Sequence, residues 1–105
     1  MKSILNEDLN YVVFTKNAKT VSDFDVEKAY QKLKDIKYVQ ISNQTLLMRF
    51  LVGVKRKEIT PFNCIVHDLD GKIFEGIANE LGELTGNCWD SEILNVSMNY
   101  AFELI

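Results

Sequence analysis

Residues 62–73 read Phe-Asn-Cys-Ile-Val-His-Asp-Leu-Asp-Gly-Lys-Ile, and this stretch decides how the middle of the chain folds. Its beginning alternates in the way that is typical of a strand with one buried face, formed by Phe62, Cys64 and Val66. Asp68 can then cap a turn, and Gly71 can adopt the left-handed backbone that a three-residue hairpin loop requires. The pattern therefore predicts two antiparallel strands, at 62–67 and 72–78, joined by this turn.

The same stretch resembles the first motif of haloacid-dehalogenase-type phosphatases, in which apolar residues precede Asp-x-Asp-Gly. The resemblance implies that Asp68 is a nucleophile and Asp70 a general acid beside a magnesium ion. Phosphoryl transfer also needs a cage of donors around the phosphate, and the chain after Gly71 contains a single lysine, Lys72. We therefore favour the hairpin and expect no catalytic residue, metal or cofactor. A magnesium-dependent phosphohydrolase that uses Asp68 and Asp70 is kept as the alternative.

Length and composition predict a single α+β domain at residues 1–105. Hydrophobic residues make up 47% and charged residues 26%, an ordinary balance for a globular protein. No apolar run is long enough to cross a membrane, and the start of the chain turns acidic at Glu7 before a secretory signal develops. Cys64 and Cys88 lack Cys-x-x-Cys spacing, so we expect reduced thiols in a cytoplasmic protein.

The rest of the chain is expected to complete one layer of sheet and one main helix. The helix is predicted to follow Ser22, with an apolar stripe from Phe24 to Ile36. Alternation predicts further strands at Asn10–Thr15, Tyr38–Ser42, Thr45–Val54 and Asn95–Leu104, while Asn79–Thr85 is expected to form a short helix or a loop. The predicted architecture is a single antiparallel, curled sheet packed on the helix. Its order is strand, helix, four strands, short helix or loop, strand.

Charge is divided unevenly between the two parts of the chain. Residues 1–67 carry eleven basic and seven acidic side chains, whereas residues 68–105 carry one basic and eight acidic, for net charges of +4 and −7. An acidic surface of this kind favours an encounter with a basic partner. The predicted contact residues are Asp68, Asp70, Glu75, Glu80, Glu83, Trp89, Asp90 and Glu92.

From these features we expect a small, non-enzymatic protein-binding module whose partner is a protein with a basic surface. The size, the acidity and a lysine-rich composition typical of AT-rich genomes favour an inhibitor, immunity or host-modulating protein, such as one encoded by a phage or mobile element. The pI near 5.1 disfavours nucleic acid as the main partner. The edge of the sheet, at the short first or second strand, is a second route to a partner, including a second copy of the chain as a homodimer.

Overall fold

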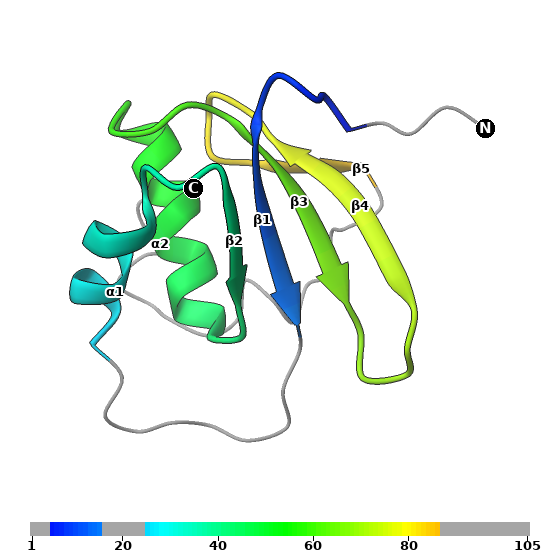
Figure 1. Cartoon of the computed structure of the whole chain (residues 1–105). Coiled ribbons are helices and arrows are strands. Elements are labelled where there is room, and N and C mark those ends of the chain that lie inside the picture. Colours follow the sequence, from blue (N-terminus) through cyan, green and yellow to red (C-terminus); the bar gives the residue numbers. More distant parts are fainter. Residues whose placement is uncertain (1–4, 16–24, 87–105) are drawn as a thin grey trace.

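The computed structural model describes residues 5–15 and 25–86 of the chain (Figure 1). Their elements are β1 (Asn10–Thr15), α1 (Val26–Leu33), β2 (Tyr38–Ile41), α2 (Gln44–Lys55), β3 (Phe62–His67), β4 (Ile73–Ala78) and β5 (Leu84–Gly86). The α+β class is confirmed. The predicted final strand at 95–104 lies outside the described residues.

The five strands form one mixed sheet in the order β2-β1-β3-β4-β5. β1 is parallel to both β2 and β3, whereas the β3–β4 and β4–β5 pairs are antiparallel. The prediction of a purely antiparallel sheet is therefore wrong. The physical reason is that helices connect β1 to β2 and β2 to β3, and such a crossover returns the chain to the same end of the sheet. β1 consequently lies inside the sheet, so among the strands described here only β2, of the two proposed as an edge, lies at one.

The segment between β2 and β3 corrects the prediction of a strand at Thr45–Val54, because it forms helix α2. Every residue from Leu46 to Val54 is buried, and a nearly continuous apolar run carries no period that separates a strand from a helix. The helix begins after Asn43, whose side chain accepts a 3.0 Å hydrogen bond from the amide of Leu46. Asn43, which lies between the two strands predicted at Tyr38–Ser42 and Thr45–Val54, is therefore an N-cap.

Helix α2 ends in a Schellman motif. The amide of Lys57 donates to the carbonyl of Val54 at 3.0 Å, and the amide of Glu58 donates to the carbonyl of Gly53 at 2.9 Å. Lys57 itself takes a left-handed φ of 65°, which costs a residue with a side chain about 1–2 kcal/mol. The motif turns the chain back over the last turn of the helix and brings Glu58 close to Gly53.

Helix α1 is short and lies against α2, and Figure 1 shows both helices next to β2. Its N-cap is Asp25, which accepts a 3.1 Å hydrogen bond from the amide of Lys28; the predicted cap, Ser22, lies outside the described residues. The one fully buried side chain of α1 is Tyr30, whose ring meets the edge of Phe50 at 5.3 Å between centroids. Tyr30, Phe50 and Leu47 share one core with the strand residues Val12, Phe14, Val39, Ile41, Phe62, Cys64 and Val66. Within residues 5–15 and 25–86, neither helix is long and apolar enough to cross a membrane.

Candidate functional surface

The β3–β4 hairpin turns at residues 68–72 with the geometry that the sequence predicts. The amide of Asp68 donates to the carbonyl of Lys72 at 2.8 Å, and the amide of Gly71 donates to the carbonyl of Asp68 at 3.1 Å. Gly71 has a left-handed φ of 82°, and Asp68 Oδ1 accepts a 2.8 Å hydrogen bond from the amide of Leu69. The Asp-x-Asp-Gly stretch is therefore a tight three-residue hairpin loop.

This end of the hairpin exposes two large apolar side chains. Leu69 in the loop is 65% exposed, and Ile73 at the start of β4 is 60% exposed. Asp70 is exposed beside them and Asp68 is half-buried. Single exposed apolar residues are normal, but an apolar pair next to two carboxylates has the composition of an interface anchor with a charged rim. We call Asp68, Leu69, Asp70 and Ile73 the hairpin tip (Figure 1).

The β4–β5 turn repeats the same geometry at the other end of β4. The amide of Asn79 donates to the carbonyl of Glu83 at 2.9 Å, and the amide of Gly82 donates to the carbonyl of Asn79 at 3.0 Å. Gly82 has a left-handed φ of 75°, and the Asn79 side chain accepts 3.0 Å hydrogen bonds from the amides of Leu81 and Glu83. Of the two predictions for 79–85, a short helix or a loop, the structure has the loop, which leads into β5.

Four of the predicted acidic contact residues fall into two groups, one at each end of β4. Asp68 and Asp70 precede the strand, and Glu80 and Glu83 follow it, so that its six residues separate the groups by roughly 17 Å. Glu75 lies between them on β4, half-buried and paired with Ile65. The second group also flanks an exposed leucine, Leu81. The remaining predicted contact residues, Trp89, Asp90 and Glu92, lie outside the described residues.

A buried polar cluster joins α1 to α2, and sequence reasoning missed it. Arg49 has a side chain only 3% exposed, and its Nε donates to Glu27 Oε1 at 2.6 Å. Its Nη2 donates to Glu58 Oε1 at 2.9 Å, and the Tyr30 hydroxyl donates to that same oxygen at 2.9 Å. The guanidinium also stacks on the Tyr30 ring, with Cζ at 3.9 Å from the centroid. Within the described residues, Arg49 Nη1 is buried without a hydrogen-bond partner.

The cluster holds its members in defined charge states. Burial, and next the hydrogen bond to Glu58, raise the pKa of Tyr30, so its hydroxyl stays neutral. For Arg49 and Glu58, burial acts against the charge, but hydrogen bonds outweigh it: those to Glu27 and Glu58 raise the pKa of Arg49, and those from Tyr30 and Arg49 lower the pKa of Glu58. Arg49 and Glu58 therefore form an ion pair at neutral pH.

Gly53 makes room for this cluster. A Cβ added at Gly53 would lie 2.2 Å from the Tyr30 hydroxyl oxygen, closer than real contacts allow. Arg49 and Gly53 are four residues apart and so share one face of α2. In the sequence, the cluster is marked only by an arginine and a glycine, four residues apart, within an apolar run. The prediction of a strand for this run gave the pair no interpretation.

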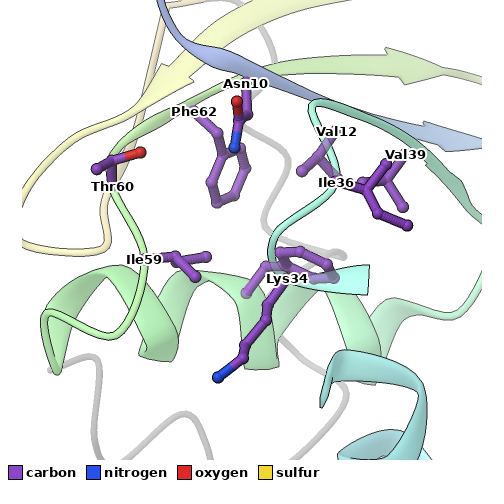
Figure 2. A pocket seen from close by; sticks show the side chains of 9 residues that line it. Asn10, Val12, Lys34, Ile36, Val39, Ile59, Thr60 and Phe62 are labelled. Carbon is purple, nitrogen blue, oxygen red and sulfur yellow. The ribbon is translucent and has the colours of Figure 1, made fainter. Parts of the chain in front are cut away.

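Two hollows lie around the connection from α2 to β3. Figure 2 shows the smaller, which has a volume of about 10 Å³ and is bounded by Asn10, Phe62, Thr60 and Lys34 among others. That is room for a single water molecule. The larger is a groove of about 440 Å³ between this connection and the β4–β5 turn, and both Glu58 and Glu80 line it. Of these two hollows, only the groove has room for a side chain of another molecule.

No observation in the part of the chain described favours the phosphohydrolase alternative. One carboxylate oxygen of Asp68 bonds to the turn itself, and His67 is half-buried in β3, paired with Thr15 and Ile73. Residues 5–15 and 25–86 contain no group of three His, Cys, Asp or Glu side chains placed to hold a metal ion. Comparisons with protein-family models, with curated proteins and with solved structures find no match.

Proposed function

We propose that this protein is a small, non-enzymatic binding module of the cytoplasm that contacts another protein through the acidic side chains of its C-terminal part. The observation that carries the proposal is the hairpin tip, where Leu69 and Ile73 are exposed next to Asp68 and Asp70. Each exposed aliphatic side chain forgoes about 1.5–3 kcal/mol that its burial would contribute. A partner that covers them would recover part of that energy.

The expected partner has an apolar pocket rimmed by Lys or Arg side chains. Leu69 and Ile73 are the anchors, and the carboxylates speed the encounter and fix its orientation. Glu80 and Glu83, which flank Leu81, form a second contact of the same composition, and Glu75, Trp89, Asp90 and Glu92 remain predicted members. The reduced thiols that the sequence predicts at Cys64 and Cys88 support the cytoplasmic assignment. Within this proposal we keep the inhibitor, immunity or host-modulating class.

The test compares what the tagged wild-type chain and its variants capture from the cells that make it. A captured protein is identified by mass spectrometry, purified and titrated against each variant by calorimetry. We expect Leu69→Ser to weaken binding about tenfold or more, because it removes an apolar anchor. Asp70→Lys should weaken binding and reduce its dependence on salt, because it removes a charge from the rim.

Matched controls lie elsewhere on the surface. Ile36→Ser removes an exposed aliphatic side chain before β2, and Glu7→Lys reverses an exposed carboxylate near the start of the chain. Both should bind within about twofold of wild type. Equal binding by the hairpin-tip variants and these controls would contradict the proposal. Light scattering of the purified chain shows whether the captured protein is a second copy.

A further inference from the structure

The groove of about 440 Å³ beside the β4–β5 turn has apolar walls and a charged rim. Its walls include Val54 at the end of α2, with Ile59 and Pro61 from the connection to β3. Three charged side chains line it, the carboxylates of Glu58 and Glu80 and the ammonium of Lys57. This combination suits a guest with an apolar stem and a charged head.

Glu58 is held in a fixed orientation at this groove. The Schellman motif fixes its backbone on Gly53, and its Oε1 accepts hydrogen bonds from Tyr30 and Arg49. Its Oε2 forms a long, 3.9 Å ion pair with Arg56 Nη1, and the side chain is 33% exposed. A carboxylate that is held by these contacts and is still partly exposed is preorganised to accept a further donor.

Glu80 approaches from the other side, on a turn that does not share residues with the cluster. Its backbone position is fixed because Asn79 accepts hydrogen bonds from the amides of Leu81 and Glu83 on either side. Two carboxylates, each on a rigid turn, thus line one groove that has apolar walls. A planar guanidinium, with five donors and a three-carbon stem, fits this chemistry better than a compact ammonium.

We propose that the groove takes an arginine side chain of the protein partner. The alkyl stem packs on Ile59 and Pro61, and the guanidinium pairs with Glu58 Oε2 and the Glu80 carboxylate. The inference rests on the proposed function, since the arginine belongs to the bound protein. The inference specifies the chemistry of a second contact with the partner, which lies about one strand length from the hairpin tip.

The test uses the free protein and two small probes, N-acetyl-arginine amide and N-acetyl-citrulline amide. Citrulline has the same stem and shape but no charge. Backbone amide NMR shifts are followed while each probe is added in the millimolar range. We expect saturable shifts at Lys57, Glu58 and Glu80 with the arginine probe alone. Equal shifts with both probes, or no saturable shift, would overturn the inference.

Variants locate the arginine probe. Glu80→Gln should weaken its binding about threefold, as expected for one exposed ion pair, whereas Glu7→Gln, which does not line the groove, should leave it unchanged. If Glu80→Gln binds as wild type does, the groove is not the site. This result is separable from the proposed function, because the hairpin-tip variants are tested on the captured protein. If Leu69→Ser no longer captures the partner and neither probe gives saturable shifts, the proposed function is retained and the arginine site in the groove is rejected.

Discussion

Arg49 and Leu69 reverse the usual distribution of polar and apolar side chains, and they do so at two sites of very different construction. Arg49 carries a charge into the interior, yet two carboxylates and an aromatic ring surround it. Leu69 carries four apolar carbons into solvent on a loop that backbone hydrogen bonds from Asp68 to Lys72 and from Gly71 to Asp68 hold in place. The burial of Arg49 is explained by contacts within the fold, whereas the exposure of Leu69 is not.

This difference separates a residue that the fold needs from one that it does not. Arg49 links α1 to the segment after α2, and removing it takes the guanidinium away from the Tyr30 ring and from the carboxylates of Glu27 and Glu58. Leu69, Asp70 and Ile73 could change without disturbing a buried contact, because they are exposed and the turn depends on Asp68 and Gly71. We therefore assign the cluster to stability and the tip to contact, and the following variants test that division.

The largest expected effect is that of Arg49→Ala. Truncation leaves a cavity and removes the closer of the two ion-pair partners of Glu58, so we expect a loss of about 3 kcal/mol in the free energy of unfolding, measured by urea denaturation. Arg49→Met is the matched control, since it restores apolar volume without charge and should recover part of the loss. A cost below about 1 kcal/mol for Arg49→Ala would show that the cluster does not hold the helices together.

Gly53→Ala should come next, at about 1–2 kcal/mol. Alanine is normally the better helix former, but here its Cβ meets the Tyr30 hydroxyl oxygen. In the Tyr30→Phe background the same change should cost less, because the closest contact is gone. A double-mutant cycle of the four proteins measures this difference. Purely additive effects would be inconsistent with the packing of Tyr30 on Gly53.

A smaller effect should follow pH. The pKa of Glu58 is lowered in the folded chain, so its stabilisation is complete above the unfolded value of about 4.3 and is lost as pH falls through the folded pKa. Unfolding measured from pH 7 down to pH 3 should therefore show a shallower decline in Glu58→Gln than in wild type. Identical slopes in Glu58→Gln and in wild type would exclude this role for Glu58.

In the loop at the hairpin tip, we expect the stability of the fold to depend on the backbone conformation of Gly71. Gly71→Ala should cost about 1 kcal/mol, because φ is 82° and no atom lies within 4 Å of the added Cβ. Gly71→Asn should cost less, since asparagine tolerates this conformation. Thermal unfolding of both variants checks the order. An alanine variant as stable as wild type would mean that the turn adopts another geometry.

The sequence predicted the hairpin but not the helix that precedes it, for reasons visible at particular residues. Asp68 and Gly71 encode a local turn, and local chemistry survives in any tertiary setting. The segment from Leu46 to Val54 is buried on all sides, so its apolar pattern fits a strand as well as a helix. Because it was predicted as a strand, the parallel pairing that a crossover helix makes possible was not predicted either. Gly82 supports a second hairpin loop as Gly71 does, but the apolar spacing around it suggested a short helix. The acidic contact residues were proposed from charge alone. The place of Glu58 in the buried cluster depends on the Schellman motif at Lys57 and could not be inferred without it.

One measurement tests the division between fold and contact most directly, and it uses Leu69→Ser. The free energy of unfolding and the affinity for the captured protein are determined on the same preparation. We predict stability within about 0.5 kcal/mol of wild type and binding weakened about tenfold or more. A variant that loses stability and keeps its affinity would contradict the account, because Leu69 would then serve the fold and not the contact.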